Sequence, residues 1–187
     1  MTSQLALKTR DPKAAMSEDT TFARFIEAFR NHPAGVAVVT ADAGEGPVAL
    51  TATSVCSVNA TPTLLAFSVS GKSSSSPTIR QAESVVVHLL STEQKALAQL
   101  CSTSGVDRFA DRSMWTRLET GEPYFPEVAA WIRGKVVGQL EASGSALILV
   151  EATHVGGRNT DPNSEPGQPL VYHRRTWHGL GESSTLA

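Results

Sequence analysis

The sequence lacks the features that mark nucleic-acid-binding, membrane and metal proteins. Its 16 Lys and Arg are outnumbered by 18 Asp and Glu, and the resulting net charge of -2 at pH 7 favours neither nucleic acid nor an anionic membrane as a partner. The two cysteines, Cys56 and Cys101, are too few for a disulfide framework or a zinc site, and we expect both to be buried. No stretch approaches the ~20 apolar residues of a membrane-spanning helix. We therefore expect a cytoplasmic protein that binds no metal, no nucleic acid and no membrane.

The beginning of the chain also lacks the continuous apolar core of a secretion signal. Its mixture of Lys, Arg, Asp, Pro and Ser predicts a disordered leader over residues 1–18. A chain of 187 residues suits a single domain with a substantial core. We place that domain at residues 19–180 and expect a flexible tail over residues 181–187.

Familiar catalytic motifs are absent as well. No G-x-G-x-x-G follows a strand pattern, so a dinucleotide is not expected to bind as it does in doubly wound nucleotide folds. Neither a G-x-S-x-G nucleophile elbow nor an H-E-x-x-H zinc motif is present. Any chemistry must use another arrangement of residues.

Three helices are predicted from apolar spacing and from capping residues. The first is predicted where four apolar residues recur at helical spacing: Phe22, Phe25, Ile26 and Phe29. Pro33 ends it, because proline disfavours helix in the residue before it. A second helix, over 76–82, opens with Ser76-Pro77. A third begins at Ser91, which has capping-box spacing to Gln94.

Strand patterns outnumber helical ones. Six segments read as strands: 36–40, 47–52, 64–67, 84–90, 131–141 and 146–154. Glycine-rich turns separate the first two and the last two. His88 lies inside a β-branched run, where a hydrogen-bonded structural histidine is expected. The pattern predicts a mainly β protein, an antiparallel barrel with peripheral helices and not a βαβ fold.

Two hydroxyl-rich segments flank the predicted strand 64–67. The first, Leu50–Val58, reads as a strand that carries hydroxyls at Thr51, Thr53, Ser54 and Ser57. The second, Ser70–Pro77, surrounds Lys72 with serines. Hydroxyls and backbone N–H groups suit a heteroatom-rich ring, and a lysine in a serine turn suits a phosphate. A serine-rich surface loop beside an ordinary strand is the open alternative.

The succession of four segments resembles the flavin reductase family, the small split-barrel partners of two-component flavin monooxygenases. These segments are His32–Thr40, Leu50–Val58, Lys72–Ser76 and Pro169–Arg175. No single segment is diagnostic, but their order and spacing are specific, and the resemblance covers roughly residues 20–180. It implies a flavin-binding, Greek-key-like split barrel.

The resemblance also implies which residues contact the flavin. Those beside the isoalloxazine would be Thr51, Ala52, Thr53, Ser54, Val55, Ser57 and Val58. Those at the phosphate would be Ser70, Lys72, Ser73 and Ser74. Thr103 and Arg108 would reach the phosphates or the adenine end. The flavin is FAD or FMN, with FAD favoured.

Nicotinamide contacts are implied near the end of the chain, from His173, Arg174, Arg175 and Thr176. An arginine suits a pyrophosphate, and NADH is favoured over NADPH; a solvated basic edge is the open alternative. No general acid or base is expected, because the hydride passes directly from nicotinamide to flavin. Many relatives carry Gly-Asp-His where this chain has Gly144-Ser145-Ala146, so an imidazole near the nicotinamide is missing. His32 and His173 are the candidates to replace it.

The resemblance implies an NAD(P)H-dependent flavin reductase that supplies reduced flavin by diffusion to a separate flavin-dependent monooxygenase. Two alternatives stay open: a flavin-storage module with the same barrel, and a flavoprotein oxidoreductase that retains its flavin. The basic segment His173–Arg175 favours an enzyme, since storage needs no dinucleotide contact. Strand edges and three tryptophans favour a homodimer.

Overall fold

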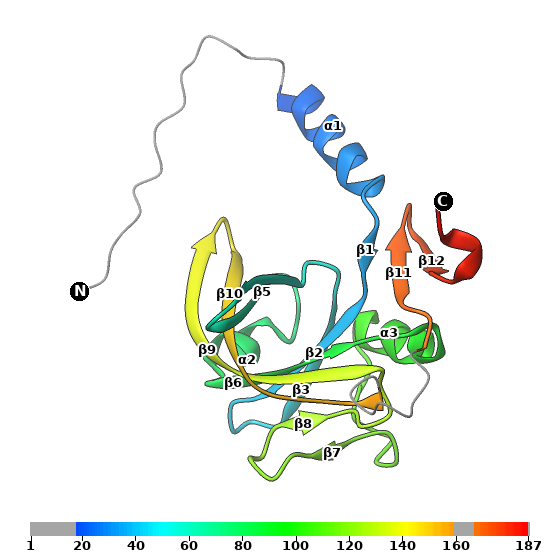
Figure 1. Cartoon of the computed structure of the whole chain (residues 1–187). Coiled ribbons are helices and arrows are strands. Elements are labelled where there is room, and N and C mark those ends of the chain that lie inside the picture. Colours follow the sequence, from blue (N-terminus) through cyan, green and yellow to red (C-terminus); the bar gives the residue numbers. More distant parts are fainter. Residues whose placement is uncertain (1–17, 159–166, 187) are drawn as a thin grey trace.

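The computed structural model describes residues 18–158 and 167–186 and is dominated by one antiparallel sheet (Figure 1). Its seven strands lie in the order β3-β2-β6-β9-β10-β5-β4. Their bounds are β2 (Ala37–Asp42), β3 (Pro47–Ala52), β4 (Cys56–Ala60), β5 (Thr63–Ser70), β6 (Ser84–Leu89), β9 (Ala130–Ala142) and β10 (Ser145–Gly156). The predicted hairpins β2–β3 and β9–β10 are confirmed, and the turn of the second has Ser143 and Gly144 at positive φ.

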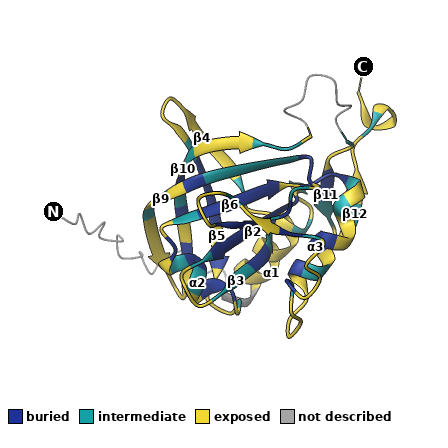
Figure 2. Ribbon diagram, turned by 90° about the horizontal axis from the view of Figure 1, so that it is seen from below, coloured by how far each residue is buried: buried dark blue, intermediate teal, exposed yellow. Residues whose placement is uncertain are grey.

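The sheet curls around a core without closing. Alternate residues of its strands point inward, and the largest of those with almost no exposed surface include Phe67, Val85, Val87 and Ile148. Figure 2 shows this buried interior bordered by the exposed edge strand β4. Because β3 and β4 end the sheet without pairing to each other, the barrel is split. The predicted antiparallel barrel is confirmed in this open form.

A second core lies on the other face of β2, β3 and β6. It is covered by the helix α3 (Lys95–Ser102) and by the long segment 103–129, which carries the short strands β7 (Thr116–Arg117) and β8 (Pro123–Tyr124). Leu97, Phe109 and Phe125 pack there against the sheet. The capping box is present: Oε1 of Gln94 accepts hydrogen bonds from both the backbone N–H (3.0 Å) and the hydroxyl (2.8 Å) of Ser91. It opens the 3₁₀ turn η1 (Thr92–Gln94) that leads into α3.

A small three-stranded sheet carries the remaining elements. It has the order β1-β11-β12, from β1 (Ala34–Gly35), β11 (Leu170–His173) and β12 (Thr176–Gly179). The helix α1 (Glu18–Arg30) precedes β1 and projects from the body of the molecule (Figure 1). The helix α2 (Ser76–Gln81) follows the serine turn, and η3 (Glu182–Ser184) follows β12. No helix within the described ranges is long and apolar enough to cross a membrane.

Three expectations about these elements are wrong. The run Leu50–Val58 is not one strand: β3 ends at Ala52, the chain bends, and β4 begins at Cys56. The thiol of Cys56 is exposed because β4 is an edge strand with every residue exposed, whereas Cys101 is buried as expected. The N-cap residue of α2 differs as well, since it is Ser75 and not Ser76. The predicted leader 1–18 lies almost wholly outside the described residues.

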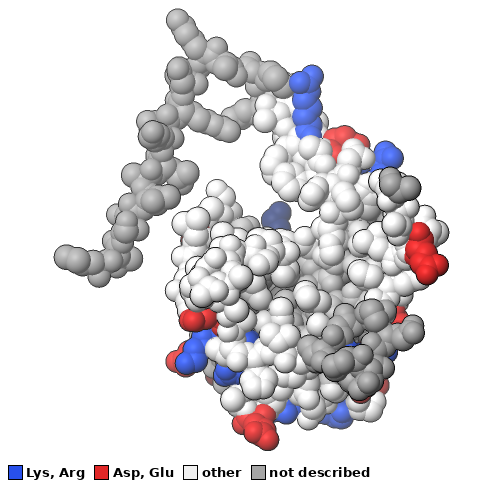
Figure 3. Space-filling view, viewed as in Figure 1, with Lys and Arg blue, Asp and Glu red and all other residues white. Residues whose placement is uncertain are grey.

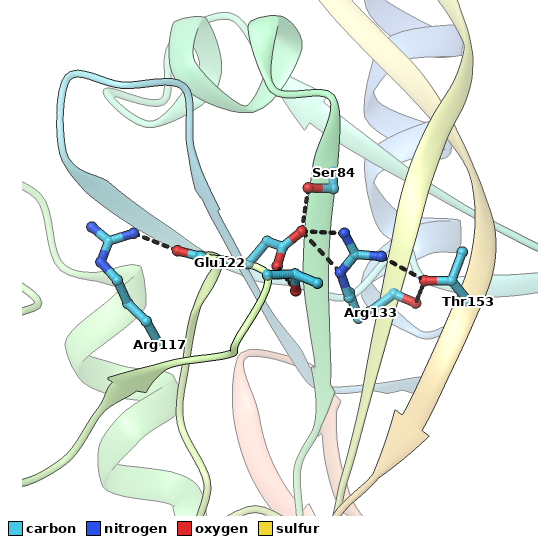
Figure 4. Close-up of polar contacts among 7 residues, drawn as sticks. Ser84, Arg117, Glu122, Arg133 and Thr153 are labelled. Atoms are coloured by element: carbon cyan, nitrogen blue, oxygen red, sulfur yellow. Dashed lines mark hydrogen bonds and ion pairs between the residues drawn. The ribbon is translucent and has the colours of Figure 1, made fainter.

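A buried ion pair fastens the hairpin β7–β8 to the sheet (Figure 4). Glu122, 6% exposed, pairs with Arg133 of β9 at 2.6 Å and accepts hydrogen bonds from Ser84 and Thr120. Arg117 adds a second link through its ion pair with Asp42 at 2.6 Å. Segment 103–129 is therefore held to the barrel at β2, β6 and β9.

Candidate functional site

A cleft of about 840 Å³ separates the barrel from α1 and the small sheet. Figure 3 shows it as a notch beneath α1, with a basic side chain visible in its depth. Its lining comes from five places in the chain: Ile26, Phe29, Arg30, His32, Pro33, Ala34, Gly35, Thr53, Ser54, Val55, Cys56, Ser68, Tyr172, Arg174 and Arg175. Among these lining residues there are three arginines and no carboxylate, so the cleft suits an anionic ligand.

One wall of the cleft carries hydroxyl groups. The chain bends between β3 and β4, and this bend turns Thr53, Ser54 and Val55 toward the cleft. Ser54 fixes the bend against β5, because its hydroxyl accepts the backbone N–H of Ser68 at 3.0 Å and lies 3.3 Å from the carbonyl oxygen of that residue. Both hydroxyls and backbone groups at this bend are therefore placed to meet a polar ring.

The opposite wall is cationic. Arg174 and Arg175 form the two-residue turn between β11 and β12, with φ angles of 49° and 63°. The N–H of Arg174 donates to the carbonyl oxygen of Arg30 at 3.1 Å, which joins this turn to the end of α1. Left-handed backbone costs a non-glycine residue roughly 1–2 kcal/mol. Strain of this kind gathers at functional sites, and here it presents two guanidinium groups at one cleft.

The serine turn forms a second polar group, beyond Ser68 along β5. The backbone of Gly71 in this turn lies so close to Gly144 that a Cβ at Gly71 would be 2.1 Å from the carbonyl oxygen of Gly144. Lys72 is exposed on the turn, and the backbone N–H of Ser73 donates to Ser70 at 3.0 Å. The serine turn thus packs against the turn between β9 and β10, while its lysine remains accessible.

Arg108 reaches this turn from the segment after α3. One of its terminal nitrogens donates to the hydroxyl of Ser75 at 3.1 Å and the other to the carbonyl oxygen of Thr103 at 2.8 Å. Ser75 in turn donates to the carbonyl oxygen of Ala49 at 2.7 Å. Nε of Arg108 and Oγ of Ser76 are buried polar atoms without a hydrogen-bond partner. Buried polar groups normally have partners, so these two atoms are exceptions among the buried polar atoms of the described residues.

The structure divides the predicted site residues into groups. Thr53, Ser54, Val55, Arg174 and Arg175 meet in the cleft. Ser70, Lys72, Ser73, Ser74, Thr103 and Arg108 belong to the serine turn and the segment that faces it.

The other predicted residues do not line the cleft. The hydroxyl of Thr51 donates to the carbonyl oxygen of Ala98 at 2.7 Å, and Ala52 is buried in the barrel core. Ser57 and Val58 are exposed on β4, Thr176 is exposed on β12, and the ring of His173 lies 5.8 Å from that of His178.

Sequence reasoning missed several residues of these groups. Arg30 and Tyr172 line the cleft, and so do Cys56 and Ser68. Ser75 accepts a hydrogen bond from Arg108, although the sequence placed it only beside the start of a helix. The tandem arginine, unusual at a two-residue hairpin turn, was the available signal for the turn geometry.

The comparisons with known proteins agree with this geometry. The model of the flavin reductase like domain matches residues 29–181. The chain belongs to the flavin reductase family. A curated relative, the NADH:FMN oxidoreductase of Rhodococcus qingshengii, is 41% identical over 151 residues, covering 81% of this chain and 78% of the relative. The reductase component of 4-hydroxyphenylacetate 3-monooxygenase from Escherichia coli is 27% identical, covering 87% and 94%.

A solved flavin reductase structure shares the fold. The flavin reductase domain protein of Arthrobacter sp. FB24 has 31% identity and a TM-score of 0.78, covering 86% of this chain and 96% of its own. The resemblance matches Ala146 of this flavin reductase to the family histidine. Ala146 is 2% exposed and packs in the barrel core, so it does not line the cleft.

Proposed function

We propose that this protein is an NADH-dependent flavin reductase that supplies reduced flavin to a separate monooxygenase. The observation that carries the proposal is the cleft, in which a hydroxyl-bearing bend faces three arginines across a space of about 840 Å³. Such a cleft holds a polar ring on one side and a dinucleotide phosphate group on the other. The family of this chain and the names of its relatives support the same activity.

The flavin, when bound, accepts the hydride of the nicotinamide. The residues of this chain bind and orient. Thr53 and Ser54 would hold the ring, and Lys72 with Arg108 and Ser76 would hold the phosphate, which gives the two orphaned buried donors their partners. Arg174 and Arg175 would hold the pyrophosphate of the dinucleotide through forked hydrogen bonds.

We propose FMN as the preferred flavin and NADH as the reductant. Support comes from the relative at 41% identity, which is named for both. The FAD preference expected from the sequence has no support from that relative. The serine turn offers a site for one phosphate and does not by itself require an adenine end.

A homodimer is proposed from the exposed apolar surfaces. Phe22, Phe25 and Phe29 on α1 are 69%, 59% and 61% exposed, and the cross-strand pair Leu140 and Leu147 on the outer face of the barrel is 57% and 44% exposed. Contiguous exposed apolar groups mark interfaces. The tryptophans that suggested a dimer do not form this surface, since Trp115 is buried and Trp131 and Trp177 pack against the second core.

The first experiment asks whether the protein turns over. NADH oxidation with added FMN, followed at 340 nm, is expected to proceed and to release reduced flavin that serves a flavin-dependent monooxygenase held in a separate compartment. FMN binding without any NADH oxidation would instead indicate flavin storage. Reduction of tightly held flavin that never leaves would indicate an oxidoreductase that retains its cofactor.

The second experiment uses the strain in the arginine turn. Asn-Gly is the preferred pair where both residues have positive φ, so Arg174→Asn/Arg175→Gly is expected to stabilise the hairpin by about 1 kcal/mol and to keep or raise Tm. The KM for NADH should rise about tenfold or more, because a charge-assisted contact contributes roughly 1.5–3 kcal/mol, while FMN affinity stays unchanged.

The matched control removes the same amount of positive charge outside the cleft, by replacing two lysines. Lys95→Gln/Lys135→Gln changes two exposed residues and should leave the KM for NADH unaltered. An unchanged KM in the arginine variant would remove the turn from the dinucleotide site. Because the fold is expected to be retained or stabilised, a loss of binding cannot be attributed to unfolding.

A further inference from the structure

The residues that line the cleft include one histidine, His32, to which the proposed function gives no role. It follows the end of α1, where its backbone N–H donates to the carbonyl oxygen of Phe29 at 3.2 Å. The ring of Phe29 contacts the imidazole edge-on, with centroids 6.4 Å apart and planes at 78°. The imidazole therefore has a defined position on the wall of the cleft. His173 does not line the cleft and has His178 as its neighbour.

His32 lies beside the arginine turn. Ala34 pairs with Tyr172 across β1 and β11. Four residues before Ala34, the carbonyl oxygen of Arg30 accepts the backbone N–H of Arg174. His32 is midway between these two fixed points, so its backbone runs along the same wall as the guanidinium groups. The opposite wall is the bend that carries Thr53 and Ser54. A ligand that spans the cleft from the arginines to this bend passes His32.

The chemistry around His32 favours a neutral, polar partner. The titratable groups that share the cleft with it are Arg30, Arg174 and Arg175, the thiol of Cys56 and the hydroxyl of Tyr172. The arginines are suited to the phosphates of a dinucleotide. An uncharged imidazole has one N–H donor and one nitrogen acceptor, which match the carbonyl and the NH₂ of a carboxamide.

We propose that His32 binds the carboxamide of the nicotinamide and thereby positions that ring against the flavin. The inference rests on the proposed function and adds a positioning residue to it. The hydride moves with its electron pair from the nicotinamide to the flavin, and His32 itself is neither oxidised nor asked to transfer a proton. It occupies the role for which Ala146, enclosed in the barrel core, has no suitable side chain.

The test compares two ligands that differ only in the nicotinamide. NAD⁺ and ADP-ribose share the pyrophosphate and adenosine, and neither reduces FMN, so both are titrated by calorimetry into protein saturated with FMN. His32→Ala is expected to raise the Kd for NAD⁺ about tenfold, the equivalent of 1.4 kcal/mol, and to leave the Kd for ADP-ribose unchanged. His32→Gln, whose amide has both a donor and an acceptor, should recover part of the loss.

Controls distinguish a failure of the role of His32 from a failure of the proposed function. His154→Ala removes an exposed histidine that lies outside the cleft, stacked on Trp131, and should change neither Kd. If His32→Ala lost affinity equally for both ligands, or lost none for NAD⁺, the proposed role of His32 would be overturned. A wild-type protein that binds neither ligand would overturn the proposed function, which is a different result.

Discussion

At the scale of single residues, the hydrogen bonds of His88 determine its protonation. Its Nδ1 lies 2.9 Å from the carbonyl oxygen of Val38, which only accepts, and its Nε2 lies 3.0 Å from the backbone N–H of Phe125, which only donates. Nδ1 therefore carries the proton and the ring is neutral. Burial lowers the pKa of His88 to about 4, against the opposing effect of the hydrogen bond to Val38. This confirms the structural histidine expected from the sequence.

His88 makes stability depend on pH in a predictable direction. Below about pH 6.5 His88 becomes protonated in the unfolded chain, whereas in the folded protein it stays neutral down to about pH 4. The free energy of unfolding therefore falls as the pH drops through that window, by roughly 3 kcal/mol in total. His88→Gln should be less stable at pH 7.5 and show a flatter decline between pH 6.5 and 4.5. Urea unfolding at several pH values measures both. A slope equal to that of the wild type would contradict the account, and His154→Gln serves as the exposed control.

At the scale of elements, segment 103–129 depends on the ion pair of Glu122 and Arg133 (Figure 4). Burial alone raises the pKa of Glu122, but hydrogen bonds from Arg133, Ser84 and Thr120 outweigh it and lower the pKa to about 2. The ionised carboxylate therefore stabilises the fold fully when the pH is above 4.5, the ordinary pKa of a glutamate. This contribution is lost as the pH falls from 4.5 toward 2. The same segment carries Arg108 to the serine turn.

Removing one member of this pair should cost more than removing both. Glu122→Gln leaves Arg133, whose side chain is 17% exposed, without its counter-charge, and breaking a buried pair in this way typically costs about 3–5 kcal/mol. Glu122→Leu/Arg133→Met, which leaves no unpaired charge, should cost less. Urea unfolding of the wild type, Glu122→Leu, Arg133→Met and the double variant measures the coupling. A double variant that is as unstable as the sum of the singles would show that the two residues act independently.

The sequence predicted the elements whose patterns are repetitive and local. The β-branched run 84–90 and the segments 131–141 and 146–154 were predicted as strands and are confirmed as β6, β9 and β10. The bend at Thr53–Val55 escaped prediction, since its hydroxyls read equally well as one face of a strand and only the hydrogen bonds between Ser54 and Ser68 reveal it. The stripe of α1 was read correctly as helical, yet its aromatic rings face outward, because an amphipathic pattern does not say what covers the apolar face.

The candidate site was predictable only where residues are contiguous. Lys72 stood out within a run of serines, and Arg174-Arg175 within a basic segment. Arg30 had no such signal, because it reaches the cleft through the pairing of β1 with β11, in which Ala34 and Tyr172 are 138 residues apart. Contacts between segments so distant in sequence depend on the assembled fold.

At the scale of the whole molecule, the cleft separates two apolar surfaces that do not cover each other. Phe22 and Phe25 lie on the projecting helix, and Leu140 and Leu147 lie on the outer face of the barrel. A two-fold dimer allows surfaces of one chain to meet their counterparts on a second copy. Such pairing would also enclose the cleft, since Phe29 and Ile26 of α1 belong to its lining.

If α1 is part of the dimer interface, Phe22→Glu/Phe25→Glu should convert the protein to a monomer. Burying an exposed Phe contributes about 1.5–3 kcal/mol, so losing two of them weakens association at least a hundredfold. Light scattering at micromolar concentration should show the wild-type mass halved. Circular dichroism should show a folded monomer, because the helix projects from the body and its stripe belongs to neither core. Leu180→Glu/Leu186→Glu, which changes two exposed apolar residues near the end of the chain, should remain a dimer. A wild-type protein that is already monomeric and fully active would show that the cleft functions within one chain and that α1 has another partner.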